Sequence, residues 1–238
     1  MPPAKLRVAA LYDVHGMPHA LEAVLADVER EGVDVVLFGG DLAWGPFPRE
    51  AIDIARSLSH AEFVRGNADE LFSDEAMSPR FADGRAFVVD RLDDERIEWL
   101  TSLPFSWSAD DTLFVHANPR DTETPYFEWS PEETLAEALA DVTESRVVSG
   151  HVHMQSERAV GAKHWTCAGS VGMPYEDEPG AYWTLLVDGV PQFRRTDYDR
   201  ERAATAVRSS GHPLAAELAD ENVLRAPTRA EARAMMSE

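Results

Sequence analysis

Short apolar runs alternate with amphipathic stretches through the first part of the chain, and this alternation limits the fold more than any other feature of the sequence. The run LRVAALY (6–12) is followed by a stretch in which Leu21, Val24 and Val28 recur at helical spacing before Gly32. Residues at this spacing share one face of a helix, and a glycine commonly ends one. The sequence therefore predicts a buried strand, a loop and an amphipathic helix.

The same unit repeats further along the chain. A second apolar run lies at 33–41, a second helical stretch at 48–59 and a third short strand at 61–69. One more helix is expected near 93–103, and more strands are expected at 111–119, 145–153, 162–170, 181–189 and 190–195, the last two joined through Asp188-Gly189 as a hairpin. Alternating buried strands and helices favour a mainly parallel sheet covered by helices, with the later strands in a second sheet packed against it. The fold class is thus layered α/β.

Composition narrows the class of protein. The chain has 238 residues, of which 44% are apolar, which is enough for a sizeable core. Its net charge of -21 repels nucleic-acid backbones and anionic membrane surfaces, so general nucleic-acid or membrane binding is not expected. The residues from Tyr198 on turn polar and rich in Ala, Arg and Glu, and we interpret 198–238 as a helical extension of one domain at 1–197.

The cellular compartment is predicted from what the chain lacks. The single cysteine, Cys167, excludes an internal disulfide, and its surroundings favour a small buried side chain over a nucleophile. The N-terminal apolar run is too short for a signal peptide, and no segment approaches the roughly 20 apolar residues that span a bilayer. We therefore expect a cytoplasmic protein, with its oligomeric state left open.

Side chains able to bind a metal ion follow five of the predicted strands. They are Asp13, His15, Asp41, Asn67, His116, His151 and His153. Ligands of open α/β sheets collect beyond the carboxyl ends of the strands, so these distant residues can converge there. Taken one at a time, Asp13 and Asp41 could instead be helix caps, Asn67 a turn residue and His116 a core histidine.

The donor set favours a particular chemistry. Two carboxylates, several imidazoles and one amide oxygen suit Mn²⁺, Fe²⁺, Zn²⁺ or Ni²⁺ better than Ca²⁺ or Mg²⁺. Two such ions about 3.5–4 Å apart lower the pKa of a shared water and bind the oxygens of a phosphoryl group. The sequence therefore predicts hydrolysis of a small phosphorylated substrate.

These residues stand in blocks that resemble a known family. The order DVH, GGD, GNAD, VH and GHVH over residues 13–153 is similar to that of the calcineurin-like metallophosphoesterases. The segment AGSVGMP (168–174) is similar to a glycine-serine turn of their small bacterial phosphodiesterase branch. The resemblance covers roughly residues 5–195 and leaves out the C-terminal tail.

The resemblance implies a fold, a cofactor and residue roles. It implies a four-layer α/β/β/α sandwich of two mixed sheets flanked by helices, with a metal-bridging hydroxide as nucleophile on a phosphodiester or nucleotide-like phosphate. Asp13, His15 and His153 would hold one ion and Asp41 would bridge, while the second ion would be held by Asn67, His116 and His151. We expect two divalent ions, with Mn²⁺ preferred and Fe, Ni²⁺ or Zn²⁺ as alternatives.

One position departs from many members of that family. Where phosphomonoesterases often carry a histidine after the Asn, this chain has Ala68, which cannot donate a proton. Without a general acid, hydrolysis should favour esters with good leaving groups. His19 is a candidate replacement, with an exposed surface histidine as the alternative.

Alternatives remain open for the residues that contact the substrate and for the function. Asn67, Arg120 and Tyr126 are candidate substrate contacts, although Arg120 could serve only in an ion pair and the loop around Tyr126 could simply pack onto the domain. The rival function is a non-catalytic protein-interaction module on the same fold, and a protein phosphatase is disfavoured because the chain is short. The C-terminal helices could mediate a dimer or cover the site.

Overall fold

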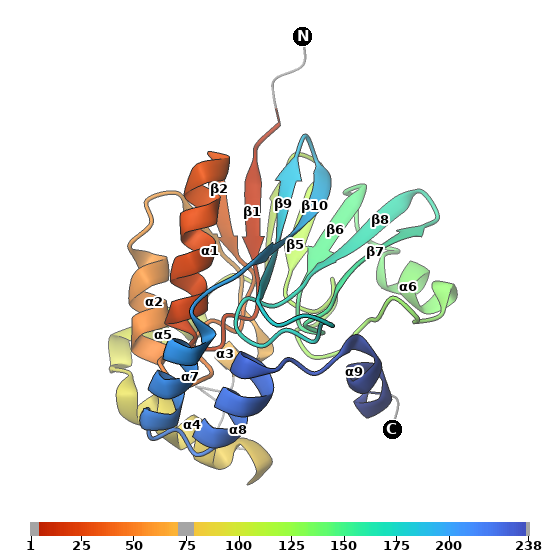
Figure 1. Cartoon of the computed structure of the whole chain (residues 1–238). Coiled ribbons are helices and arrows are strands. Elements are labelled where there is room, and N and C mark those ends of the chain that lie inside the picture. The colour runs from red at the N-terminus through yellow and green to blue at the C-terminus, as the bar shows by residue number, and fades with distance from the viewer. Residues whose placement is uncertain (1–4, 71–78, 237–238) are drawn as a thin grey trace.

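Two five-stranded sheets pack face to face in the computed structural model, which describes residues 5–70 and 79–236 (Figure 1). The first sheet has the order β10-β9-β1-β2-β3. Its strands are β1 (Val8–Leu11), β2 (Val35–Phe38), β3 (Ala61–Phe63), β9 (Ala181–Val187) and β10 (Val190–Thr196). The first three run parallel, whereas β9 pairs antiparallel with both β1 and β10.

The second sheet has the order β4-β5-β6-β8-β7. Its strands are β4 (Ser106–Ala109), β5 (Thr112–Val115), β6 (Arg146–Ser149), β7 (Gln155–Val160) and β8 (Lys163–Ala168). Here β5, β6 and β8 run parallel, and the edge strands β4 and β7 are antiparallel to their neighbours. Both sheets are therefore mixed, as predicted.

The core has two main parts, one between the two sheets and one between the first sheet and its helices. Val8 and Ala10 of β1 lie in a buried cluster with Phe114 of β5, whereas Ala9 and Leu11 lie in the cluster formed with the helices. Successive side chains of a strand point to opposite faces, so β1 is buried on both sides. This explains why its sequence is a continuous apolar run rather than an alternating one.

Helices cover both outer faces. The first sheet is covered by α1 (Pro18–Glu31), α2 (Pro48–Arg56), α5 (Asp94–Ser102) and α7 (Arg200–Ser209), whose apolar residues share its outer cluster. The second is covered by α6 (Glu132–Ala138), which packs on Val147 and Trp165. The predicted four-layer sandwich is confirmed (Figure 1).

Local signals place the ends of several elements. Helix α1 carries Pro18 in its first turn and ends at Gly32, whose φ of 63° lies in the left-handed region. Helix α5 begins after Asp93, whose side chain accepts a hydrogen bond from the Arg96 amide. The β9–β10 hairpin turns at Asp188-Gly189 with φ values of 53° and 78°, as a type I′ turn requires.

Some elements differ from the prediction. The strands β4 and β7 were not predicted, because both are edge strands with a half-exposed, largely polar sequence that lacks an apolar run. The strand expected over 61–69 ends at Phe63, and α3 (Asn67–Glu70) begins where its end was expected. Helix α4 (Pro79–Arg91) was also not predicted.

The C-terminal residues are helical, as expected. After α7 come α8 (Ala215–Glu217), a π-helical segment η1 (Leu218–Leu224) and α9 (Arg229–Met235). In Figure 1, α8 and α9 lie below the sheets, and α9 lies on the side of the second sheet. Within residues 5–70 and 79–236, no helix combines the length and apolar character needed to cross a bilayer.

Candidate metal centre

The seven predicted ligands lie together where the parallel strands of the two sheets end. Asp13 and His15 follow β1, Asp41 follows β2, and Asn67 opens α3 just after β3. His116 follows β5, and the pair at 151 and 153 follows β6. We refer to these seven side chains as the candidate metal centre.

The backbone at this centre is held in an unusual conformation. Five of the seven residues have a left-handed φ, between 48° and 66°, namely Asp13, His15, Asp41, His151 and His153. Non-glycine residues adopt this region at a cost of about 1–2 kcal/mol each. Strain of this kind persists only where the surroundings enforce it, and it concentrates at functional sites.

Neighbouring loops enforce that conformation. The Asp13 amide donates to the Gly40 carbonyl at 3.1 Å, and the His15 amide donates to the Asp41 carbonyl at 2.9 Å. On the other side, the Ser170 hydroxyl donates to the Asp13 carbonyl at 2.8 Å. Three segments thus hold one another in place: the loop after β1, the loop after β2 and the segment around Ser170.

Three imidazoles are oriented by backbone carbonyls. The Nδ1 atoms of His15, His116 and His153 lie 3.1, 2.9 and 2.7 Å from the carbonyl oxygens of Trp44, Gly39 and Met173. A carbonyl can only accept, so each Nδ1 carries the proton and each Nε2 presents a lone pair. Outer hydrogen bonds of this kind fix the tautomer of metal-binding histidines.

The free lone pairs converge. His15 Nε2 lies 3.2 Å from His153 Nε2, although neither atom has a proton to share. His116 Nε2 lies 2.9 Å from Asn67 Oδ1 and 3.2 Å from His151 Nδ1. The other nitrogen of His151 lies 3.0 Å from the Glu123 carbonyl, so His151 offers Nδ1 instead. Lone pairs repel one another at these distances unless a cation lies between them.

The two carboxylates stand between these groups. Asp13 Oδ1 lies 3.4 Å from His153 Nε2 and 4.0 Å from His116 Nε2, while Asp13 Oδ2 accepts the His151 amide. Asp41 turns one oxygen toward His15 Nε2 at 3.8 Å and the other toward His116 Nε2 at 3.6 Å. Two triads could each hold a metal ion: Asp13, His15 and His153, and Asp13, Asp41 and His116.

One atom shows directly that a positive partner fits here. Asp13 Oδ1 is fully buried and has no hydrogen-bond donor among the residues that the structure describes. A buried carboxylate oxygen without a donor is costly. A divalent cation coordinated at this point would relieve that cost and the repulsion between the imidazole lone pairs.

The protonation equilibria agree with this fit. Burial lowers the pKa of His15 to about 3 and that of His151 to about 4, so both rings are neutral, as metal ligands must be. Burial and the neighbouring Asp13 charge raise the pKa of Asp41 to about 8. Burial opposes ionisation of Asp13 as well, but the imidazoles of His153, His116 and His15 hold its pKa well below the usual value. Burial and the repulsion between the two carboxylates therefore oppose full ionisation of both, and a bound cation would favour it.

A third carboxylate, which lies behind the centre, was missed from the sequence. Asp69 is fully buried, and its Oδ2 accepts the amides of Asp41 and Gly66, each at 2.9 Å. Burial and the Asp41 charge raise its pKa to about 7. The sequence feature that could have identified Asp69 is its place in the GNAD block, two residues after Asn67. Asp69 fixes the backbone that carries Asp41.

The remaining predicted residues lie elsewhere. The ring of His19, on the first turn of α1, packs edge-on against Phe47 at 5.9 Å between centroids. Arg120 pairs with Glu137 of α6, and Tyr126 packs edge-on against Trp165 at 5.2 Å. None of these contacts involves the seven residues of the metal centre, so roles for His19, Arg120 and Tyr126 stay predictions.

Ala68 and Cys167 have structural surroundings. Ala68 is 6% exposed, and its amide donates to Asp41 Oδ1 at 2.9 Å, so the position acts through its backbone. Cys167 is buried, with its thiol 3.4 Å from the Gly150 carbonyl, and burial raises its pKa to about 12. Cys167 is therefore a protonated core residue, as expected.

Comparison with known proteins agrees with this geometry. The sequence model of the calcineurin-like phosphoesterase superfamily domain matches residues 6–189. An uncharacterised protein of Methanocaldococcus jannaschii is 25% identical over 127 residues, which are 50% of this chain and 52% of that protein. The chain thus matches about half the length of this curated relative.

Two solved structures are similar over nearly the whole chain. A metallophosphoesterase from Sphaerobacter thermophilus has a TM-score of 0.75 at 25% identity, covering 90% of this chain and 99% of its own. A hypothetical protein from Pyrococcus horikoshii has a TM-score of 0.80 at 19% identity, covering 92% and 99%. The second likeness concerns the fold alone.

Proposed function

Because the chain belongs to the calcineurin-like phosphoesterase superfamily, we propose that it is a binuclear metal-dependent phosphoesterase that hydrolyses a phosphodiester or a nucleotide-like phosphate. One observation carries the proposal. Two triads of ligand atoms share Asp13, and Asp41 turns one oxygen toward each of two histidines. Such an arrangement is suited to two neighbouring cations.

The residues divide between the two ions. His15 and His153, with Asp13, would hold one ion, and Asn67, His116 and His151 would hold the other, with Asp41 between them. Asp13 Oδ1 lies within 4.0 Å of nitrogens on both sides, so it too can serve both ions. Two divalent ions bound here would supply Lewis acidity, lowering the pKa of a water molecule and drawing charge from the phosphoryl oxygens.

The chain's own residues set the charge of the site. Neutral imidazoles and two carboxylates leave roughly two units of positive charge on a pair of divalent ions, by formal counting. The site would then attract an anionic phosphate although the protein as a whole is acidic. The carbonyl-anchored histidines and Asp69 hold the ligands in place before substrate arrives.

The position after Asn67 restricts the leaving group. Ala68 cannot protonate a departing oxygen, and a general acid typically contributes 10²- to 10⁴-fold. Esters whose leaving groups are weak bases, such as aryl phosphates and phosphoanhydrides, should therefore react best. If His19 serves as the acid, His19→Ala should slow poor leaving groups more than good ones, whereas equal slowing would contradict that role.

The function is tested with metal-stripped protein reconstituted with Mn²⁺, Ni²⁺, Zn²⁺ or Mg²⁺. We expect Mn²⁺ to support hydrolysis of a bis-aryl phosphate in a panel that also contains an aryl phosphate, cyclic nucleotides and nucleotide polyphosphates. Asp41→Asn keeps the acceptor for the Ala68 amide but removes a ligand charge, and should abolish turnover. The matched control is Asp141→Asn, on an exposed loop, and should retain it.

Calorimetry on the same samples separates the alternatives. Full activity after chelation, or in Asp41→Asn, would exclude the metal mechanism. Metal binding without hydrolysis of any ester in the panel would favour the non-catalytic interaction module instead.

A further inference from the structure

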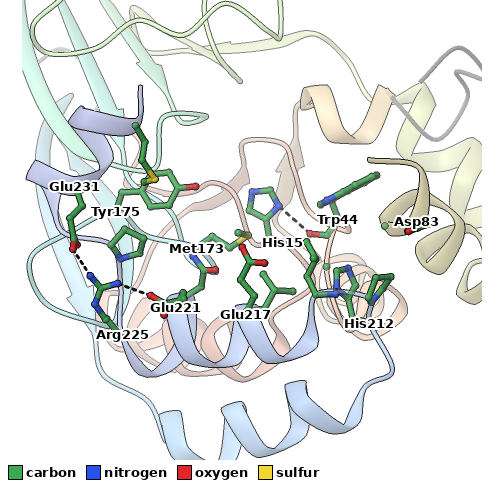
Figure 2. A pocket seen from close by; sticks show the side chains of 18 of the residues that line it. His15, Trp44, Asp83, Met173, Tyr175, His212, Glu217, Glu221, Arg225 and Glu231 are labelled. Atoms are coloured by element: carbon green, nitrogen blue, oxygen red, sulfur yellow. Dashed lines mark hydrogen bonds and ion pairs between the residues drawn. The ribbon is translucent and has the colours of Figure 1, made fainter. Parts of the chain in front are cut away.

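A cavity of about 980 Å³ lies beside the candidate metal centre (Figure 2). One wall comes from the centre itself and its neighbours, His15, Trp44, Met173 and Tyr175. The opposite wall comes from residues 212–235, which we call the C-terminal wall. The superfamily match ends at residue 189, so this wall lies outside the part of the chain that the family model matches.

The cavity is continuous with the reacting centre. His15 belongs to both, and the Trp44 carbonyl that orients His15 is part of the same loop. The ring of Tyr175 lies 4.9 Å from that of His153, between centroids. A phosphate held at the metal centre would therefore direct one of its ester groups into this cavity, which has the volume of a small-molecule site.

The cavity lining carries an excess of negative charge. Asp83, Glu217, Glu221 and Glu231 line it, and Arg225 is its single permanently charged cation among the residues that the structure describes. Arg225 is already paired with both Glu221 and Glu231 (Figure 2). Among the side chains that the structure describes, which leave out 71–81, no cation pairs with Asp83 or Glu217. An anionic group in this cavity would be repelled.

His212 adds no positive charge and has an unused donor. It is 5% exposed, and its Nδ1 accepts the Leu214 amide at 3.1 Å, so the proton lies on Nε2. In the described part of the chain, this Nε2 finds no acceptor. Burial and the nearby Arg91 lower the pKa of His212 to about 4, so the ring is neutral near pH 7. The neutral His212 ring therefore adds no positive charge to the cavity wall.

Aromatic side chains complete the lining. Trp44 and Tyr175 are half-buried and stand on the metal-centre side, opposite the carboxylates of the C-terminal wall. Aromatic faces combined with carboxylates attract amines and quaternary ammonium groups, through cation–π attraction and charge. The carboxylates of the same lining would repel a phosphate chain or a carboxylate.

We propose that this cavity binds the organic group of the ester and selects a group that carries a positively charged amine or quaternary ammonium. The proposal rests on the proposed phosphoesterase function, because it assigns the substrate class of that same centre. Glu217, which projects from the C-terminal wall into the cavity in Figure 2, supplies the unpaired charge that attracts the cation.

The test uses two diesters of the same shape. One is 4-nitrophenyl phosphorylcholine, and the other is 4-nitrophenyl 3,3-dimethylbutyl phosphate, in which carbon replaces the quaternary nitrogen. Both release 4-nitrophenolate, so the chemical step and the signal are the same. With Mn²⁺-loaded full-length protein we expect a KM about tenfold lower for the choline ester, given the usual strength of a desolvated cation–π contact with an added charge.

Variants locate the source of the preference. Glu217→Gln should reduce the ratio of the two KM values to about two, because the amide keeps the shape and loses the charge. Glu133→Gln, at an exposed position of α6 outside the cavity, should leave the ratio unchanged although it removes one negative charge as well. Equal KM values in the wild type, or an equal loss of preference in both variants, would overturn the proposal.

A binding measurement separates this proposal from the function on which it rests. Calorimetric titration of metal-free protein with choline and with 3,3-dimethylbutan-1-ol needs no turnover. Preferential choline binding that Glu217→Gln weakens would support the cavity assignment even if neither ester were hydrolysed. Hydrolysis of both esters with equal KM, without choline binding, would support the phosphoesterase and refute the cavity assignment.

Discussion

At the scale of single residues, the candidate centre contains atoms that find no hydrogen-bond donor among the residues that the structure describes. Asp13 Oδ1 lacks a donor, and the Nε2 atoms of His15 and His153 face each other at 3.2 Å. Each of these would be destabilising in a purely structural site. The Nδ1 atoms of the same two rings, in contrast, donate to carbonyls, so the arrangement is suited to binding a cation.

Asp69 should support the centre without touching a metal. Asp69→Ala would leave the buried amides of Asp41 and Gly66 without an acceptor, at a cost of about 2–4 kcal/mol in the free energy of unfolding. Because Asp41 would lose its support, Mn²⁺ affinity should fall about 10- to 100-fold. Denaturant unfolding and calorimetric titration measure the two effects.

Asp69→Asn is the matched control, since its amide oxygen can still accept both amides. It should retain most of the stability and of the Mn²⁺ affinity. Wild-type affinity in Asp69→Ala would contradict the supporting role.

His212 should make stability depend on pH. Its pKa is about 4 in the folded protein against 6.5 without burial, so the unfolded chain binds the proton more readily between these values. Stability contributed by the neutral ring is therefore complete above pH 6.5 and is lost as the pH falls toward 4. His212→Asn, which can still accept the Leu214 amide, should reduce the loss of unfolding free energy between pH 7 and pH 5 by about 1–2 kcal/mol. An unchanged difference, measured by denaturant unfolding at both pH values, would refute this.

At the scale of elements, helix α9 is attached to the domain through a half-buried ion pair. Arg229, at the start of α9, donates from Nη1 to both oxygens of Glu176 at 3.0 and 2.9 Å and to the Gln155 carbonyl at 3.0 Å. Its Nη2 donates to Glu128 at 2.9 Å. Since Glu176 follows Tyr175, this contact also connects α9 to the ring that packs on His153.

Removing the positive charge of Arg229 should loosen the C-terminal wall. Arg229→Met would leave the Glu176 carboxylate, whose side chain is only 8% exposed, without its partner. We expect a loss of about 1–3 kcal/mol, less than for a fully buried pair because Arg229 is partly exposed. Hydrogen exchange should become faster in residues 212–235.

Two further variants check the cause of this effect. Arg208→Met breaks an exposed pair with Asp220 and should cost less than about 1 kcal/mol. Adding Glu176→Gln to Arg229→Met should recover part of the loss, because it removes the unpaired charge. Equal effects of Arg208→Met and Arg229→Met would show that burial of the pair is unimportant.

At the scale of the whole molecule, the two sheets bring their ligands to one edge. The first sheet contributes Asp13, His15 and Asp41, and the second contributes His116, His151 and His153. A cation bound there would link the two sheets. Metal binding should therefore stabilise the whole fold rather than one loop.

Metal loading should raise the melting temperature. At a free Mn²⁺ concentration 100 times the dissociation constant, we expect a gain of about 2.7 kcal/mol, or roughly 5–10 °C for a chain of this size. Chelation should reverse the shift, and Asp41→Asn should lack it. Asp141→Asn should melt as the wild type does, and a shift that persists in Asp41→Asn would place the ion elsewhere.

Much of the fold could be predicted because it depends on local signals. The strands buried on both faces read as continuous apolar runs, α1 ends at a glycine with a left-handed φ, and Asp188-Gly189 forms the expected hairpin turn. The strands β4 and β7 could not be found this way, because each is stabilised by pairing with a neighbour rather than by an apolar run of its own.

By itself, the sequence determined which side chains can bind metal and that they follow strands, since residue type and strand pattern are both written locally. Only the tertiary structure decided that Asp13 faces both histidine groups, that Asp69 supports Asp41, and that Glu217 faces a cavity beside His15. The physical reason is that these relations join residues far apart in the chain, and their distances depend on how the two sheets and the C-terminal helices pack.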